Sequence, residues 1–377
     1  MIKVIHCADL HLDSHPSSGI LDQKSDTLGD FKALIDLTNE KKADILLIAG
    51  DLFDTPYPDE KCVFEVLSGL TDCNAEVFIC PGNHDAYVSD CVYKKYSFPE
   101  NVHIFTSPDV QSITARCGAE VYGYAFISMS SKRKALPEIS DKSRLGLYCI
   151  HADLSTSSSY APISTLDIEM TNADYVALGH VHKRSEIAYS GKVPYAYSGS
   201  ICARDFGECG KKGAIYAEFY PNESTNGYLS SFEFIPFVKR HYEQITMSVS
   251  NIYSNKELIG ELESIIMKEG YKKHTSLRVI FIGERQSDVS FFSSMFSALD
   301  ERLFEFEYED KTIRAISLEQ LENDKTIRGD LYRVLKDRLH SPDVFIQKEA
   351  RLALRLALTS LNAEDISGLI QAQETDI

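Results

Sequence analysis

The stretch Ile45-Leu-Leu-Ile-Ala-Gly-Asp-Leu-Phe-Asp54 joins a run of five apolar residues to a glycine and two aspartates. A short run of this kind, rich in Ile and Leu, is typical of a strand buried on both faces. Gly50 permits a tight turn directly after the strand, which brings Asp51 to the strand's end. Upstream, residues 2–5 form another apolar run, and residues 31–38 repeat apolar side chains at helical spacing. The order strand, helix, strand predicts a layered α/β fold.

Polar side chains follow this strand and four similar apolar runs, at residues 2–5, 77–80, 145–150 and 175–178. An Asp, Asn or His comes directly after each run, usually next to a glycine. Loops at the carboxyl ends of strands in α/β sheets converge on one edge, where ligand sites form. The five motifs are Cys7-Ala-Asp-Leu-His11, Gly50-Asp-Leu-Phe-Asp54, Pro81-Gly-Asn-His-Asp85, His151-Ala-Asp153 and Gly179-His-Val-His182. Five such coincidences in one chain predict a shared functional site.

The residue types in these loops suit a pair of divalent cations about 3.5–4 Å apart. Such a site needs one carboxylate that bridges both ions, with oxygen and nitrogen ligands around it. Asp51 is the predicted bridging ligand. The other predicted ligands are Asp9, His11 and His182 for the first ion, and Asn83, His151 and His180 for the second. Neutral imidazoles and one carboxamide leave enough positive charge on the ions to attract a phosphodiester.

His84 has no ligand role in this scheme and is the predicted catalytic residue. It would stabilise the charge that develops on phosphorus, or protonate the leaving alkoxide. Asp85 is predicted to orient His84 and to hold it protonated. Arg204 and Asp54 are candidate substrate-binding residues. Arg204 would contact phosphate or would be a solvated loop residue, and for Asp54 an orienting or loop-capping role is favoured over ligation.

The five motifs, in this order, resemble those of the calcineurin-like metallophosphoesterases over about residues 1–240. Three further stretches resemble the DNA-repair exonuclease branch that contains the SbcD-like and YhaO-like nucleases. They are Asp9-Leu-His-Leu-Asp-Ser14, Asp51-Leu-Phe-Asp-Thr-Pro56, and Tyr197-Ser-Gly-Ser200 with Arg204-Asp-Phe-Gly-Glu208 and Gly210-Lys-Lys-Gly213. One position departs from the archaeal and eukaryotic relatives, which have a histidine where this chain has Asp54.

The resemblance implies an α/β protein with a four-layer αββα phosphoesterase sandwich at residues 1–241. A small α/β capping domain would follow at 242–316, and a helical C-terminal region at 317–377. Within these parts, apolar spacing predicts helices at 258–266 and near 289–303 and strands at 277–282 and 304–308. Ser341-Pro342 predicts the start of the last helix.

The resemblance also implies a function. The chain would be the nuclease subunit of a DNA repair complex, an exonuclease or endonuclease with 3′→5′ polarity, which attacks phosphodiesters with a hydroxide activated by two metals. Manganese is the expected metal, with iron(II) and zinc as alternatives. The implied partners are DNA and an SMC-like (SbcC-like) ATPase that docks on residues 317–377, and a homodimer is compatible with the same resemblance.

Composition narrows the class of protein. The 377 residues carry a net charge of −17, with 44% hydrophobic and 25% charged residues, which excludes a largely disordered chain. DNA is not expected to be attracted to the whole of so acidic a surface. The nine cysteines include no CxxC pair, so neither a zinc ribbon nor a redox motif is supported. No apolar run reaches the length of a membrane span and the N-terminus has no secretory segment, so we expect a cytoplasmic protein without membrane association.

Two other functions remain open at this point. A phosphoesterase acting on a small nucleotide or a phosphoprotein would use the same ligands, because the metals contact only the phosphate. The acidic charge favours that alternative, and the C-terminal extension favours the nuclease. A non-catalytic scaffold is the third reading, but it gives no reason for a complete ligand set. Lys211-Lys212 would contact a DNA backbone or would simply be a solvated charge pair.

Overall fold

The computed structural model describes residues 1–14, 23–132, 135–155, 157–222, 227–237, 240–315 and 317–362. The chain divides into two compact units, Met1–Tyr242 and Glu243–Ile377. The predicted cap (242–316) and the predicted helical region (317–377) fall together in the second unit. Their separation into two domains therefore stays a prediction.

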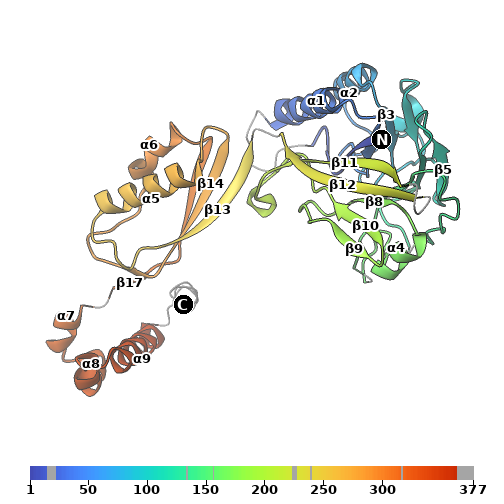
Figure 1. The fold of residues 1–377 in the computed structure, drawn as a ribbon. Coiled ribbons are helices and arrows are strands. Elements are labelled where there is room, and N and C mark those ends of the chain that lie inside the picture. The colour runs from blue at the N-terminus through green and yellow to red at the C-terminus, as the bar shows by residue number, and fades with distance from the viewer. Residues whose placement is uncertain are drawn as a thin grey trace. The chain divides into compact units, whose positions relative to one another are not determined.

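Two six-stranded sheets form the first unit (Figure 1). In the first sheet β1 to β4 run parallel, and β11 pairs antiparallel with β1 and with β12. In the second, β6, β7, β8 and β10 run parallel, and β5 and β9 are antiparallel edge strands. The first sheet has the order β12 (Gly227–Pro236), β11 (Gly213–Asn222), β1 (Ile2–Cys7), β2 (Ile45–Ile48), β3 (Glu76–Ile79) and β4 (Val102–Ile104). The second has the order β5 (Gln111–Thr114), β6 (Glu120–Gly123), β7 (Gly146–His151), β8 (Tyr175–Gly179), β10 (Val193–Tyr197) and β9 (Ala188–Ser190).

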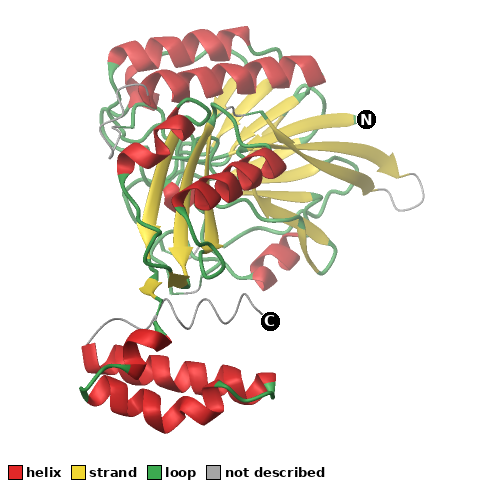
Figure 2. Cartoon of the chain, turned by 90° about the vertical axis from the view of Figure 1, so that its left-hand side faces the viewer, coloured by secondary structure: helices red, strands yellow, loops and turns green. Residues whose placement is uncertain are grey.

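Helices cover the outer faces of the two sheets. The long helices α1 (Gln23–Lys41) and α2 (Glu60–Asp72) lie side by side over the first sheet (Figures 1 and 2). The short helix α4 (Thr165–Thr171) packs on the second sheet through the buried Ile168. The remaining helical turns of this unit are α3 (Val92–Lys95) and η1 (Phe206–Glu208). This order of layers confirms the predicted αββα sandwich.

The position of strand β2 in the fold explains why its sequence is an unbroken apolar run. Leu46 and Ile48 belong to the core under α1 and α2, whereas Ile45 and Leu47 belong to the core between the two sheets. Alternate side chains of a strand point to opposite faces, so a strand in an inner layer needs an apolar residue at every position. All five predicted strands of this unit are observed, as β1, β2, β3, β7 and β8.

The second unit contains a three-stranded sheet in the order β13-β14-β16, and a pair of short parallel strands. Leu258, Leu262 and Ile266 of helix α5 recur every four residues and are buried in its core, as predicted. Three further helices follow at the C-terminal end. The elements are β13 (His241–Ser248), α5 (Asn255–Glu269), β14 (Thr275–Ile282), β15 (Glu284–Arg285), η2 (Ser293–Phe296), α6 (Ser297–Asp300), β16 (Glu305–Asp310), β17 (Ile313–Arg314), α7 (Leu318–Glu322), α8 (Ile327–Leu339) and α9 (Val344–Asn362).

Two local predictions for this unit are wrong. The helix expected near 289–303 is reduced to the short turns η2 and α6, in a stretch with serines at 290, 293, 294 and 297 that compete for backbone hydrogen bonds. The last helix begins at Val344 and not at Pro342. The Asp343 carboxylate accepts a hydrogen bond from the Phe345 amide at 2.8 Å, so Asp343 caps the helix. None of the helices in the described ranges has both the length and the hydropathy needed to cross a bilayer.

Candidate metal centre

The five motif loops come from both sheets. Three follow β1, β2 and β3 of the first sheet, and two follow β7 and β8 of the second. Backbone hydrogen bonds join neighbouring loops, from the Asp9 amide to the Gly50 carbonyl at 3.0 Å and from the Ala152 amide to the Gly179 carbonyl at 3.3 Å. Gly50 has φ of +100°, and a Cβ there would lie 2.1 Å from Nδ1 of His151. Only glycine therefore allows the two sheets to approach at this point.

Four of the predicted ligands have a left-handed backbone, which L-residues rarely adopt. The φ angles are 52° at Asp9, 44° at His11, 50° at Asp51 and 103° at His180. Each such residue costs about 1–3 kcal/mol and persists only where the surrounding structure holds it. Strained residues of this kind cluster at functional sites, and here they turn successive side chains toward one point.

Asp9, His11 and His182 form the first cluster, with their ligand atoms within 4.8 Å of one another. Nδ1 of His11 lies 2.7 Å from the Asp54 carboxylate, and Nδ1 of His182 lies 2.6 Å from the Glu208 carboxylate. Because a carboxylate only accepts, these short contacts favour the proton on Nδ1 in both rings; at His182 the Glu208 contact is shorter than the 3.1 Å contact with Nη2 of Arg204. The two Nε2 lone pairs then face each other at 3.1 Å. Such an arrangement repels unless a cation lies between the nitrogens, so these residues fit a metal ion.

Asp9, Asp51 and His151 form the second cluster, again within 4.8 Å. Nδ1 of His151 donates to the Ala49 carbonyl at 3.1 Å, which leaves its Nε2 as an acceptor. That Nε2 faces Oδ1 of Asn83 at 2.8 Å and Oδ2 of Asp51 at 3.4 Å. Three acceptor atoms therefore converge with no proton between them, which is the donor set of a second cation.

Asp51 belongs to the second cluster and also lies close to the first, whereas Asp9 is a member of both. Its Oδ2 is 3.4 Å from Nε2 of His151 and 3.7 Å from Nε2 of His11. Its Oδ1 accepts from the His84 amide at 2.9 Å. A Cβ on Gly82 would lie 2.1 Å from this Oδ1, so the glycine makes room for the carboxylate. Asp51 therefore lies near a histidine of each cluster, and its bridging role stays a prediction.

His180 lies at the edge of the second cluster. Its ring is 5.2 Å from that of His151 and 4.8 Å from that of Tyr160, and its Nε2 is 3.7 Å from the Asp153 carboxylate. Its amide donates to the Asp9 carboxylate at 3.1 Å. The backbone of His180 thus orients one predicted ligand, and ligation by its own imidazole stays a prediction.

Burial favours the neutral form of three imidazoles in the centre. It lowers the pKa of His11 and His151, and that of His180 to about 4. Neutral imidazole is the form that binds a cation. Burial and the charge of Asp51 raise the pKa of Asp9 well above its usual value. Burial alone would raise the pKa of Asp51 too, but His151 and His11 lower it overall. Two carboxylates this close favour a bound cation.

The prediction that Asp85 orients His84 is wrong. Asp85 is fully buried, and its carboxylate accepts hydrogen bonds from the amides of Gly82 at 2.7 Å and Phe53 at 3.1 Å and from the Tyr93 hydroxyl at 2.5 Å. It fixes the loop that carries Asn83 and His84. The acid beside His84 is Asp54, whose Oδ1 is 3.5 Å and whose carbonyl is 3.3 Å from Nδ1 of His84.

The sequence analysis missed Glu208. Besides His182, its carboxylate contacts the Ser200 hydroxyl at 3.2 Å and Nε of Arg204 at 3.3 Å. The Arg204 guanidinium also lies 3.6 Å from Asp54. Arg204 and Asp54, the two candidate substrate-binding residues, therefore belong to the group of charged side chains that support the predicted ligands. Glu208 stands within a quoted motif, but nothing in the local sequence connects it with His182, which precedes it by 26 residues.

Lys212 also belongs to the charged residues that surround His182, and it does not form a surface patch with Lys211. It is 5% exposed, and its ammonium donates to the His182 carbonyl at 3.1 Å and to the Ser200 hydroxyl at 3.0 Å. Burial lowers its pKa. The alternative that Lys212 contacts a DNA backbone is therefore wrong.

Comparison with known proteins identifies the family of this centre. Residues 2–184 match the model of the calcineurin-like phosphoesterases. The chain carries a domain of that family, which uses divalent metal ions, and the first unit contains the matched residues. It is 32% identical to the uncharacterized metallophosphoesterase YhaO of Bacillus subtilis over 253 residues, 62% of this chain and 60% of that protein. Its identity with the DNA double-strand break repair protein Mre11 of Saccharolobus solfataricus is 23%, over the whole of both chains. A solved structure, TT1561 of Thermus thermophilus, covers 61% of this chain and 98% of its own, with 11% identity and a TM-score of 0.37.

Proposed function

We propose that this protein is a metal-dependent DNA nuclease that hydrolyses phosphodiester bonds in DNA repair. The observation that carries the proposal is the convergence of acceptor atoms where the two sheets meet. Nε2 of His11 faces Nε2 of His182 at 3.1 Å, and Nε2 of His151 faces the oxygens of Asn83 and Asp51. These atoms repel one another until cations lie between them. We assign the ligands as Asp9, His11, Asp51, Asn83, His151, His180 and His182.

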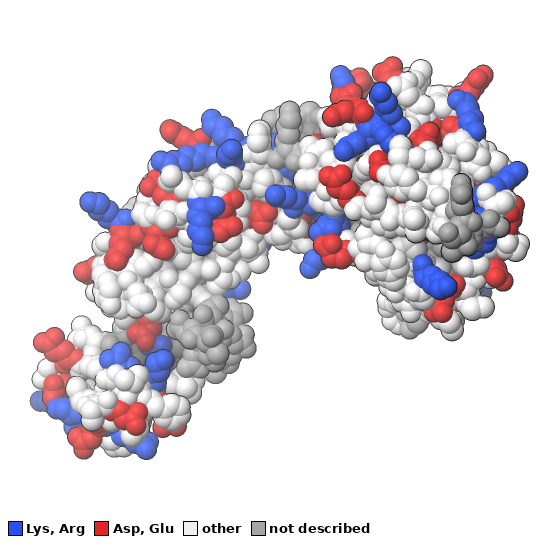
Figure 3. All heavy atoms as spheres, in the orientation of Figure 1, with Lys and Arg blue, Asp and Glu red and all other residues white. Residues whose placement is uncertain are grey.

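The alignment with Mre11 supports DNA as the substrate class. It extends over the entire chain and so includes the second unit, which the phosphoesterase model at residues 2–184 does not reach. A phosphoesterase for small substrates would need only the first unit. Figure 3 shows Lys and Arg interspersed with Asp and Glu on the visible face, in keeping with the net charge of −17. DNA would then be attracted chiefly by bound cations and by local basic groups.

In the proposed reaction, two bound cations would lower the pKa of water and neutralise charge on the phosphate. The chain's own residues have separable tasks. Asp54 and Glu208 orient the imidazoles of His11 and His182 through Nδ1. The His84 side chain is 40% exposed, and its Nδ1 lies against Asp54. Its Nε2 is therefore free to meet the substrate and to give a proton to the leaving alkoxide. Asp85 holds the backbone of the His84 loop.

Three finer parts of the proposal rest mainly on the family resemblance. Manganese is the proposed metal, because a mixed set of carboxylate, carboxamide and imidazole ligands accepts it. The proposed polarity of digestion is 3′→5′. An SMC-like ATPase is the proposed partner of residues 317–377, and the local charge of that region agrees with a docking role, since residues 325–355 hold eight Lys or Arg against four Asp or Glu.

Cleavage of two substrates in parallel tests the function. The full chain is incubated with Mn²⁺ and either single-stranded and duplex oligonucleotides or bis-p-nitrophenyl phosphate. We expect shortening of the oligonucleotides that EDTA abolishes. Asp51→Asn should abolish cleavage of both substrates, and Asp36→Asn, which makes the same change on the exposed side of α1, should leave both rates unchanged.

The outcomes separate the candidate functions. Hydrolysis of the small diester with intact oligonucleotides would replace DNA with a small phosphodiester as the substrate. Cleavage of neither substrate, together with no binding of Mn²⁺ by calorimetry, would refute the enzymatic proposal and favour a scaffold. Loss of cleavage in Asp36→Asn would show that the assay reports a general loss of folding.

A further inference from the structure

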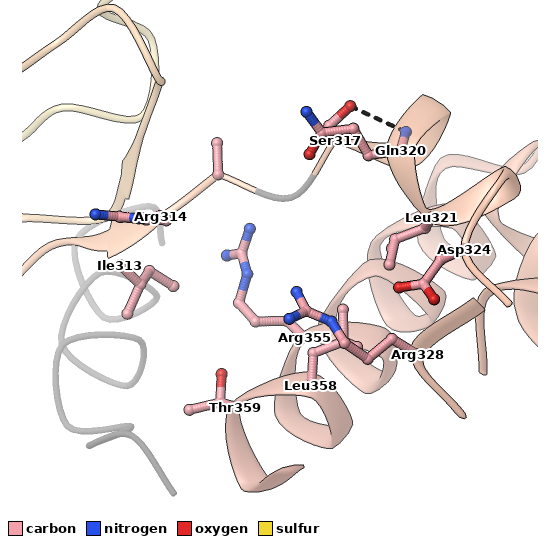
Figure 4. Close-up of a pocket in the computed structure, with 11 residues that line it drawn as sticks. Ile313, Arg314, Ser317, Gln320, Leu321, Asp324, Arg328, Arg355, Leu358 and Thr359 are labelled. Carbon is pink, nitrogen blue, oxygen red and sulfur yellow. Dashed lines mark hydrogen bonds between the residues drawn. The ribbon is translucent and has the colours of Figure 1, made fainter. Parts of the chain in front are cut away.

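A cavity of about 500 Å³ lies within the second unit, remote in sequence from the ligands of the metal centre. It is lined by residues of β17, by Ala315 and Ser317, and by residues of the helices α7, α8 and α9 (Figure 4). Its volume is in the range of small-molecule sites in proteins, about 300–1,000 Å³. The proposed nuclease reaction makes no use of it.

Arginines from separate elements line this cavity. Arg314 comes from β17, Arg328 from α8 and Arg355 from α9. In the described part of the chain, neither Arg314 nor Arg328 forms an ion pair, and the one acid in the lining is Asp324. Oδ1 of Asp324 accepts a hydrogen bond from the Thr326 amide at 2.7 Å, so one of its oxygens already serves the backbone. The cavity therefore carries an excess of positive charge.

Arg355 reaches from α9 into the middle of this lining (Figure 4). Its terminal nitrogen pairs with Glu284, and its buried Nε has no hydrogen-bond partner among the residues that the structure describes. An unpaired buried donor costs about 1–3 kcal/mol. Burial also lowers the pKa of Arg355 to about 10. The Nε of Arg355 is therefore a donor that a bound ligand could use.

The rest of the lining includes hydroxyl groups. Ser317 and Thr359 supply hydroxyls, and the Ser317 hydroxyl already accepts from the Gln320 amide, which leaves its proton to donate. Leu321 and Leu358 are buried behind them. A guanidinium binds phosphate through parallel N–H donors, and the hydroxyls can add further donors.

We propose that this cavity binds the phosphate chain of a nucleotide through Arg328 and Arg355. A ligand with several linked phosphates matches the separate guanidinium groups, and ATP has a suitable size. The inference concerns residues of the second unit and does not depend on the proposed nuclease activity.

Calorimetry on the full chain tests this proposal. ATP, tripolyphosphate and adenosine are titrated separately in EDTA, so that the metal centre holds no cation and does not recruit phosphate. We expect ATP and tripolyphosphate to bind with 1:1 stoichiometry and adenosine not to bind. Arg328→Gln and Arg355→Gln should each weaken binding by about tenfold or more, the worth of one charge-assisted hydrogen bond. Arg328 is exposed, so its variant tests the site even if Arg355→Gln fails to fold.

Lys348→Gln is the matched control. Lys348 lies exposed on α9, outside the lining, and its replacement makes the same change of charge. It should bind ATP as the wild type does. The proposal is refuted if the wild type binds neither phosphate compound, if ATP binds but tripolyphosphate does not, or if Arg328→Gln binds as tightly as the wild type. Equal weakening in Lys348→Gln would also refute it, because general electrostatic attraction would then account for binding.

Discussion

Glu208 offers the sharpest test of the proposed metal centre, because it acts through His182 and touches no substrate. Its carboxylate accepts from Nδ1 of His182 at 2.6 Å and is only 12% exposed. Burial alone would raise its pKa, but His182 and Arg204 lower the pKa to about 2. The carboxylate is therefore ionised at every pH of interest. It holds the proton on Nδ1 and directs the Nε2 lone pair toward the other ligands.

Glu208→Gln keeps the shape of this contact and removes its charge. The amide oxygen can still accept from Nδ1, so the ring orientation is largely retained, but the imidazole becomes less basic. Loss of such an outer carboxylate typically weakens metal affinity by about 10–100-fold. For a substitution this conservative we expect the low end, about tenfold, which corresponds to about 1.4 kcal/mol. Glu208→Ala should reach the upper end because it also frees the Arg204 side chain.

Calorimetric titration of the metal-free protein with Mn²⁺ measures this effect directly. Glu186→Gln is the control, since Glu186 lies in the neighbouring loop, has an 85% exposed side chain and pairs with Arg184. We expect Glu208→Gln to weaken one class of Mn²⁺ site while the control leaves both unchanged. Unaltered Mn²⁺ affinity in Glu208→Gln, or an equal loss in Glu186→Gln, would refute the argument that Glu208 tunes a ligand.

Three further predictions follow from other buried polar groups. Asp54→Asn removes the charge that lies 2.7 Å from Nδ1 of His11. We expect kcat on bis-p-nitrophenyl phosphate to fall about 10–100-fold with little change in KM. A change confined to KM would count against the role of Asp54 in orienting His11. Tyr93→Phe leaves the Asp85 carboxylate with one donor fewer, which should lower the free energy of unfolding by about 1–3 kcal/mol, measured by urea denaturation in EDTA; an unchanged midpoint would contradict it. Burial lowers the pKa of His6 to about 3, against about 6.5 in an unfolded chain, so the unfolded chain binds the extra proton and stability falls as the pH drops below about 6.5. The loss should be about 2 kcal/mol at about pH 5, and His6→Gln should remove that part of the pH dependence; a variant with the same pH dependence as the wild type would exclude His6 as its source.

The positions of the predicted ligands could be read from the sequence because each lies at or shortly after the carboxyl end of a buried strand. Asp51 comes after a run in which every side chain is apolar, and such a run has few interpretations other than an inner strand. The distribution of the loops between two sheets could not be read in this way. β3 and β7 are both short and largely apolar, and only the pairing of strands assigns β3 to the first sheet and β7 to the second.

The partners with which side chains of the site interact were harder to predict from the sequence than the metal ligands. Asp85 is adjacent to His84 in the chain, but its carboxylate turns back to the amides of its own loop and of Phe53. Asp54 is distant in sequence and yet lies beside His84, because the loops after β2 and β3 are neighbours in the sheet. Adjacent residues on a turn commonly point in different directions, whereas residues at the ends of paired strands share one edge.

The strain and the crowding of the centre have a common explanation. Asp9, His11 and Asp51 have left-handed backbones, and their side chains bring acceptor atoms together without protons between them. Either feature alone would destabilise a protein whose only task was to fold. Each is instead what a site needs if it is to bind cations tightly, because atoms already held at ligand distances lose no further conformational entropy on binding. The free energy lost in the metal-free protein is therefore regained when cations bind, and stability and metal affinity should be coupled throughout the first unit.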